Sequence, residues 1–172
     1  MKRDSLELAH IADHAYLNLN PGVRRDDDQE DVRIFGRDYK IIEHVNNRAT
    51  GYQGTTYLRV DTGQVFVAHR GTEGLAQDVG ADAAMVALRV NSQAPEAIRL
   101  TARAIEFARQ ESNDGVKPAE VIVTGHSLGG TLAQVTAHHF DLKGETFNAY
   151  GAASLSRPIP EGGRSGINHV KA

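Results

Sequence analysis

One serine in the chain has the local sequence of a nucleophile. Residues 125–129 read Gly-His-Ser-Leu-Gly and fit the pattern G-x-S-x-G, in which a sharp turn from a strand into a helix holds a serine hydroxyl exposed above the sheet. The turn is so tight that side chains at Gly125 and Gly129 would collide, so glycine is expected at both positions. Ser127 is therefore predicted to attack a carbonyl carbon, because an activated serine hydroxyl forms covalent intermediates in hydrolysis.

The residues on both sides of the turn support this prediction. The β-branched run 121–124 precedes the turn and predicts a buried strand, whereas the apolar run 131–137 predicts a helix. His126 and Leu128 fill the variable positions of the turn, and Gly130 allows the helix to pack closely on the sheet. The serine would lie at a helix N-terminus, where free N–H groups favour developing negative charge. A glycine-rich turn without catalytic function is the alternative interpretation.

The remaining elements must form a sheet that positions this turn. The sequence predicts a helix at 5–18, a strand at 39–45, a hairpin of strands 55–60 and 64–69, a loop or short helix at 80–90, a helix at 95–112 with Pro95 in its first turn, a strand at 145–151 and the start of another at 167–170. Together with the strand and helix around the serine, these elements make a βαβαβ pattern. The pattern indicates an α/β fold with a mostly parallel central sheet, helices on both faces and an antiparallel hairpin at one side.

Composition excludes several classes of function. The chain has 172 residues, of which 40% are hydrophobic and 24% charged, which suits one domain with a substantial core. A net charge of −3 gives no basic surface for nucleic acid, and the absence of cysteine excludes disulfides and thiolate zinc sites. No signal peptide or transmembrane segment is visible. The location stays open between the cytoplasm and export by a route that needs no signal peptide.

Two polar patterns near the N-terminus could bind metal. His10 and His14 lie one helical turn apart, a spacing that suits a metal pair, but no third ligand is apparent. The charged run 24–31 lacks the alternation of a calcium-binding loop and is predicted to be a solvated loop. Neither a metal nor another cofactor is expected.

Two strings together resemble those of a known family. Val-Ala-His-Arg-Gly-Thr at 67–72 and Gly-His-Ser-Leu-Gly-Gly at 125–130 are similar to motifs of the class 3 (fungal-type) triacylglycerol lipases, which are α/β-hydrolases. Asp78 and Asp82 loosely match an acidic segment of that family, and residues 147–153 resemble its T-F-G-A-P string with alanine in place of proline. The resemblance covers residues 55–172 and extends to bacterial phospholipase-like members.

The resemblance implies an activity and a set of site residues. It implies hydrolysis of lipid acyl esters, in triacylglycerols or phospholipids, through an acyl-enzyme on Ser127 and without a cofactor. The N–H of Leu128 and the N–H and hydroxyl of Thr72 would bind the oxyanion. The substrate would be a lipid or another ester, at a membrane or micelle surface, and the segment 75–90 would cover the site unless it forms an ordinary α-helix.

The acid and base of a catalytic triad are not evident in the chain. In this fold they follow the serine in the order acid, histidine. The candidates beyond Ser127 are His138, His139, Asp141, Glu145, Glu161 and His169. The first three lie at the far end of a helix that starts at the serine, about 15–20 Å away at 1.5 Å per residue. His169 has no acid before it in the expected place.

The chain is therefore expected to be the N-terminal portion of a single lipase-like domain, 1–172, with its C-terminal part missing. A C-terminal segment, covalent or on a second chain, would supply the acid and base. That segment would also pair with the open edge of the sheet. The alternative is a catalytically silent hydrolase-like domain that binds or regulates.

Overall fold

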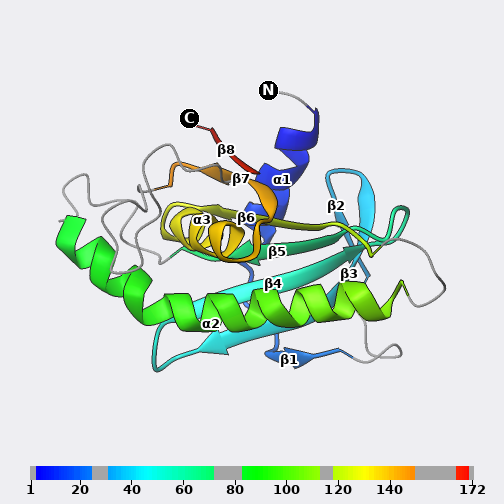
Figure 1. The fold of residues 1–172 in the computed structure, drawn as a ribbon. Helices are drawn as coiled ribbons and strands as arrows, with labels where there is room; N and C mark the ends of the chain where they lie inside the picture. Colours follow the sequence, from blue (N-terminus) through cyan, green and yellow to red (C-terminus); the bar gives the residue numbers. More distant parts are fainter. Residues whose placement is uncertain (1–2, 25–30, 72–82, 113–117, 150–165, 171–172) are drawn as a thin grey trace.

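The computed structural model describes residues 3–24, 31–71, 83–112, 118–149 and 166–170 (Figure 1). In chain order the elements are α1 (Arg3–His14), β1 (Gly22–Val23), β2 (Asp31–Ile34), β3 (Arg37–Asn47), β4 (Tyr52–Arg59), β5 (Val65–His69), α2 (Ala83–Gln110), β6 (Val121–His126), α3 (Leu128–Phe140), β7 (Lys143–Phe147) and β8 (Gly166–Val170). Within these ranges, no helix is both long and apolar enough to cross a bilayer.

The strands form one mixed sheet. Their order is β1-β3-β4-β5-β6-β7-β8, and β2 pairs separately with β3. Strands β5 to β8 run parallel, whereas every pairing among β1 to β5 is antiparallel. The predicted βαβαβ unit is confirmed as β5-α2-β6-α3-β7. The antiparallel part is larger than the predicted hairpin, because β1 and β2 also pair with β3.

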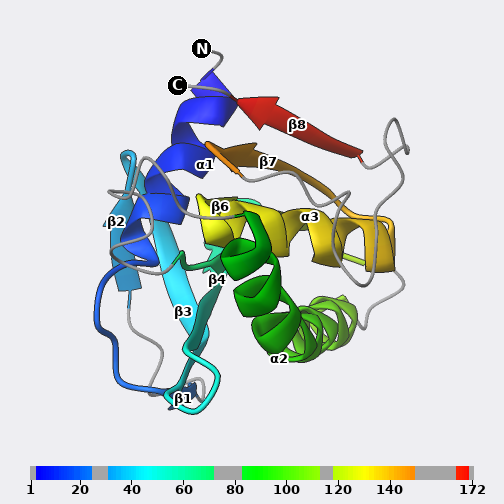
Figure 2. The same ribbon diagram turned by 90° about the vertical axis from the view of Figure 1, so that its left-hand side faces the viewer.

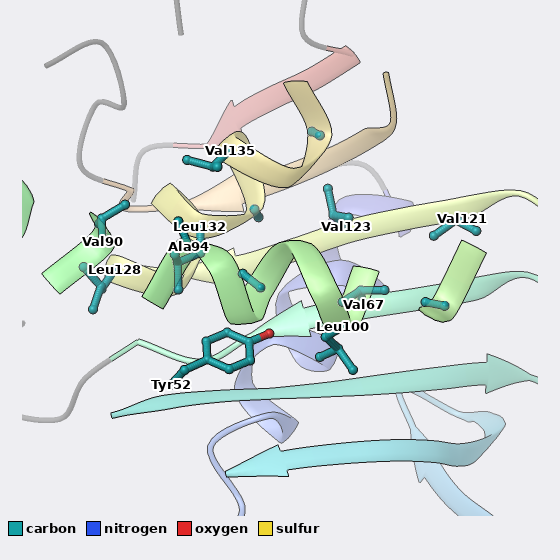
Figure 3. Packing of buried hydrophobic residues seen from close by; sticks show 14 of the residues in the cluster. Tyr52, Val67, Val90, Ala94, Leu100, Val121, Val123, Leu128, Leu132 and Val135 are labelled. Carbon is teal, nitrogen blue, oxygen red and sulfur yellow. The ribbon is translucent and has the colours of Figure 1, made fainter. Parts of the chain in front are cut away.

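Helices cover both faces of the sheet, as predicted (Figure 2). On one face α1 packs on a buried cluster that includes Ile11, Tyr39 and Phe66. On the other face α2 and α3 share a second cluster with β4, β5 and β6. Figure 3 shows Leu128 and Leu132 of α3 beside Val90 and Ala94 of α2. The helix that follows the serine is therefore held between the sheet and α2, and all its residues from 128 to 137 are buried.

The long helix α2 begins earlier than predicted. It starts at Ala83 and continues through Pro95, which was expected to mark its first turn. Proline inside a helix removes one backbone hydrogen bond and costs about 3 kcal/mol. A buried stripe on both sides of the proline offsets this cost. The stripe consists of Val86, Val90, Ala94 and Ala97. In Figure 1 the first turns of α2 lie at an angle to the rest.

The segment suspected of covering the serine is therefore helical where the structure describes it. Residues 83–90 form the first turns of α2, which is the alternative left open above. Residues 75–82 lie outside the described residues. The loop or short helix expected at 80–90 is, over 83–90, the start of a 28-residue helix.

Candidate active site

Ser127 occupies a strained backbone conformation between β6 and α3. Its φ of 57° and ψ of −125° lie where residues with a side chain are rarely found. Two backbone hydrogen bonds hold it there. The Ser127 N–H donates to the carbonyl of Phe147 in β7 at 2.9 Å, and its own carbonyl accepts from the Thr131 N–H at 3.2 Å. Such strain costs about 1–3 kcal/mol and persists only where the surroundings impose it.

The glycines of the turn allow the chain to pack on itself. A Cβ on Gly125 would lie 2.4 Å from the carbonyl carbon and oxygen of Gly129. A Cβ on Gly129 would lie 2.0 Å from the carbonyl oxygen of His69, at the end of β5. A Cβ on Gly130 would lie 2.8 Å from the Cβ of Ala149. The turn is thus pressed against β5 as well as against its own helix, a contact that the local sequence could not reveal.

The predicted oxyanion donors come from the turn and from the segment after β5. Leu128 is the first residue of α3, so its N–H has no acceptor within the helix. Thr72 lies outside the described residues. Gly71, which precedes it, lies against the turn, since a Cβ there would be 2.9 Å from the His126 carbonyl oxygen. His126 itself is partly buried, with Nδ1 3.5 Å from the Tyr16 hydroxyl.

The expectation of an exposed hydroxyl is wrong for this conformation. Ser127 is only 3% exposed. Its neighbours are buried as well: Leu128 is 0% exposed, and Phe147 of the adjacent strand β7 is 9% exposed. A substrate carbonyl can reach this hydroxyl only after part of the surrounding chain moves.

The candidate acids and bases that the structure describes do not meet Ser127. His138 and His139 are exposed in the last turn of α3, and Asp141 forms the C-cap of that helix. Glu145 accepts a hydrogen bond from Ser5 of α1 at 3.0 Å. Among the described residues no side chain hydrogen-bonds to the Ser127 hydroxyl.

Two candidates remain, His169 and Glu161. His169 pairs with Thr146 in the β7–β8 ladder. Glu161 lies outside the described residues.

The histidine pair on α1 has other contacts. His10 stacks on Phe35 with ring centroids 5.1 Å apart, and His14 Nδ1 lies 2.9 Å from the Tyr57 hydroxyl. Burial lowers the pKa of His14. In the described part of the chain no three acidic, histidine or cysteine side chains are grouped to hold a metal ion.

A polar clamp fixes the end of β5 beside the turn. Arg70 is 8% exposed, and its guanidinium donates to the side chains of Gln53 and, at 3.1 Å, Asn18. It also lies over the Tyr16 ring, 5.4 Å from the centroid. The Arg70 N–H donates to the Gln53 carbonyl at 3.0 Å, which extends the β4–β5 pairing toward residue 72. Sequence reasoning missed this clamp because its partners are distant in the chain.

Two buried histidines predict acid sensitivity. Burial is the main cause that lowers the pKa of His69 to about 3 and that of His44 to about 4. The unfolded chain binds these protons near pH 6.5, so their contribution to stability is complete above pH 6.5. It is lost as the pH falls toward 4 and 3, by up to about 1.4 kcal/mol per pH unit for each histidine.

Urea unfolding at pH 7, 6 and 5 measures this loss. The variant His44→Gln/His69→Gln should show a shallower decline than the natural sequence, whereas His138→Gln, at an exposed site, should not. An unchanged decline in the double variant would contradict the assignment.

Comparisons with known proteins agree with this architecture. The family model described as "Tle-like phospholipase domain", of the phospholipase-like type, matches residues 7–166. No curated protein sequence matches the chain.

Solved lipases share the fold at low identity. The Lip2 lipase from Yarrowia lipolytica is 12% identical with a TM-score of 0.61, over 98% of this chain and 70% of that one. A lipase from Rhizopus microsporus var. chinensis is 18% identical with a TM-score of 0.55, over 77% of this chain and 52% of that one. A triacylglycerol lipase from Penicillium expansum is 16% identical with a TM-score of 0.54, over 86% of this chain and 60% of that one. The chain thus spans about half of the Rhizopus lipase. The likeness to these structures confirms the predicted α/β-hydrolase fold.

Proposed function

Because the chain belongs to the family of Tle-like phospholipase domains, we propose that it carries the nucleophile and oxyanion hole of a serine hydrolase that cleaves acyl esters of lipids. Phospholipids are the first substrate class to test and triacylglycerols the second. The observation that supports this most is the backbone of Ser127. A strained serine at a helix N-terminus, enclosed by glycines that nothing larger can replace, has no evident structural purpose.

The proposed reaction follows from the position of the turn. Ser127 Oγ attacks the ester carbonyl carbon and transfers its proton to a base, and the alcohol leaves to give an acyl-enzyme that water then hydrolyses. The carbonyl oxygen becomes negative in the tetrahedral intermediate. The Leu128 N–H at the start of α3 and the N–H and hydroxyl of Thr72 are the proposed donors to it. Each such donor contributes about 3–4 kcal/mol to transition-state stabilisation.

The base and its acid are proposed to come from outside residues 1–172. Among the side chains that the structure describes, no histidine hydrogen-bonds to the Ser127 hydroxyl, and the chain covers 52% of the Rhizopus lipase. The supplier would be a C-terminal segment, covalent or on a second chain, so 1–172 would be the N-terminal portion of one lipase-like domain. No cofactor is proposed, because acyl transfer to serine needs only the base and the oxyanion donors.

Reconstitution tests the division of the site. Residues 1–172 combined with a C-terminal segment that carries both groups should release fatty acid from phospholipid micelles in a pH-stat assay. Residues 1–172 alone should be at least about 1,000-fold slower, because a serine without its base is a weak nucleophile. The same mixture made with Ser127→Ala is the control. Full activity of 1–172 alone would contradict the external acid and base.

A catalytically silent binding or regulatory domain is the second candidate. The burial of Ser127, at 3% exposure, favours it. A fluorophosphonate probe separates the two functions, since it reacts only with an activated serine. The completed protein is residues 1–172 together with the C-terminal segment that supplies the acid and base. Labelling of Ser127 in this protein, increased by lipid micelles as the site opens, supports the hydrolase. Absence of labelling in the completed protein supports the silent domain.

A further inference from the structure

The fully buried side chain of His69, at the end of β5, connects β4 to α3. Its Nδ1 lies 2.8 Å from the hydroxyl oxygen of Tyr52 in β4, and its Nε2 lies 3.1 Å from Oγ1 of Thr136 in α3. All three residues are 0% exposed. The strand that leads to Thr72 is thereby tied through side chains to the helix that starts after Ser127.

The protons in this chain of hydrogen bonds can be assigned. Thr136 Oγ1 donates to the Ala133 carbonyl at 3.2 Å, so its only proton is already engaged. Thr136 must then accept from His69, which places the imidazole proton on Nε2. In the neutral ring Nδ1 is left as an acceptor, and the Tyr52 hydroxyl donates to it. Only this neutral tautomer satisfies every donor and acceptor of the chain.

Gly54 makes the arrangement sterically feasible. It pairs with His69 across the β4–β5 ladder. A Cβ at Gly54 would lie 2.3 Å from the Tyr52 hydroxyl oxygen and 2.9 Å from the ring carbon that bears it. The Tyr52 ring therefore lies across the glycine, between the sheet and α2 (Figure 3), and its hydroxyl reaches the histidine.

His69 also touches α3 through its backbone. Its carbonyl oxygen would lie 2.0 Å from a Cβ on Gly129, the residue after the oxyanion donor Leu128. His69 thus contacts α3 at two points, one of them beside the proposed donor Leu128.

We propose that the Tyr52–His69–Thr136 chain of hydrogen bonds holds α3, whose first residue is the proposed oxyanion donor Leu128, in place against β5, with His69 as the positioning residue. This rests on the proposed function, because the donor matters only if Ser127 attacks a carbonyl. His69 does not touch the substrate. It acts by fixing the strand and the helix that carries Leu128 relative to each other.

Two threonine-to-valine variants provide a matched test. Thr136→Val removes the acceptor of the His69 Nε2–H. Thr101→Val alters a threonine that is equally buried and equally bonded within its own helix, to the Ala97 carbonyl at 2.8 Å, but does not contact His69. In the completed protein Thr136→Val should lower kcat on a soluble ester at least 10-fold with KM within twofold, since small misplacements of catalytic groups are costly. Thr101→Val should keep kcat within twofold.

Tyr52→Phe tests whether the three hydrogen-bonded side chains act as a unit. It should lower kcat by a similar factor, and combining it with Thr136→Val should cost much less than the product of the two losses. Unfolding midpoints of all variants show whether the loss of kcat follows stability instead. If the natural sequence is active but Thr136→Val and Thr101→Val have equal kcat, the positioning role is overturned and the proposed function stands. An inactive natural sequence overturns the proposed function together with the positioning role.

The tautomer gives a readout that needs no activity. Nitrogen NMR of residues 1–172 with labelled histidine should show His69 protonated on Nε2 only, from pH 7 to pH 5. Tyr52→Phe should change the Nδ1 signal and Thr136→Val the Nε2 signal. A cationic ring or a Nδ1-protonated ring at pH 7 overturns the proposal.

Discussion

Replacing Ser127 with alanine is expected to lower kcat of the completed protein about 10⁶-fold, the loss typical of a missing serine nucleophile. The fold should persist, because the backbone bonds to Phe147 and from Thr131 do not involve the hydroxyl. Initial rates of fatty-acid release, with circular dichroism as a check on folding, measure the effect. Ser92→Ala, at an exposed serine of α2, is the control. Residual activity above a thousandth would mean that another group is the nucleophile.

Glycine at the same position separates strain from chemistry. Ser127→Gly should be as inactive as Ser127→Ala, but more stable than it by about 1 kcal/mol, because glycine adopts φ of 57° without the cost that a Cβ imposes. Urea unfolding of the two variants measures the difference. Equal stabilities would indicate that the bend stores no strain.

Gly129→Ala is expected to destabilise the protein by about 3 kcal/mol or more, at the upper end of overpacking effects. The added Cβ would lie 2.0 Å from the His69 carbonyl oxygen and 2.8 Å from the carbonyl carbon of Arg70. Both are backbone atoms, one at the end of β5 and one just after it. This backbone cannot shift locally, because β5 is hydrogen-bonded to β4 on one side and to β6 on the other. Pushing this segment from α3 should also lower kcat at least about 100-fold, the sensitivity of such geometry.

Gly130→Ala provides the graded comparison, because its added Cβ would meet the methyl of Ala149 at 2.8 Å and the Gly125 carbonyl oxygen at 3.0 Å. The milder overlap should cost about 1 kcal/mol, at the low end of overpacking effects. Unfolding free energies of both variants decide the order. A larger loss for Gly130→Ala would refute the view that contact with β5 limits the turn.

Local signals predicted the elements that frame the site. The β-branched run before Gly125 and the strand-like runs 55–60 and 64–69 are signals that need no knowledge of distant residues. They correspond to β6, β4 and β5, although β4 begins earlier than predicted, at Tyr52. The start of α2 was missed because Pro95 suggested a boundary, whereas burial of Val90 and Ala94 against Leu128 decides that the helix continues through it.

The parts of the site that depend on distant residues were not predictable. The backbone of Ser127 is held by Phe147 of the adjacent strand β7, whose carbonyl accepts from the Ser127 N–H. The histidine at position 69 occupies an otherwise apolar strand, and its bonds to Tyr52 and Thr136 come from residues far along the chain in both directions. A buried polar residue in a central strand is the one signal that could have raised the question of its partners.

The change from antiparallel to parallel pairing within the sheet has a consequence for the order of folding. Strands β3, β4 and β5 follow one another in adjacent hairpins, whereas Val65 of β5 pairs with Val121 of β6 only after the whole of α2 has been laid down between them. Closing that longer loop is slower, so we expect the meander to form first and the β5–β6 ladder later. The bend at Ser127 would then be adopted last, when the completed sheet can hold it.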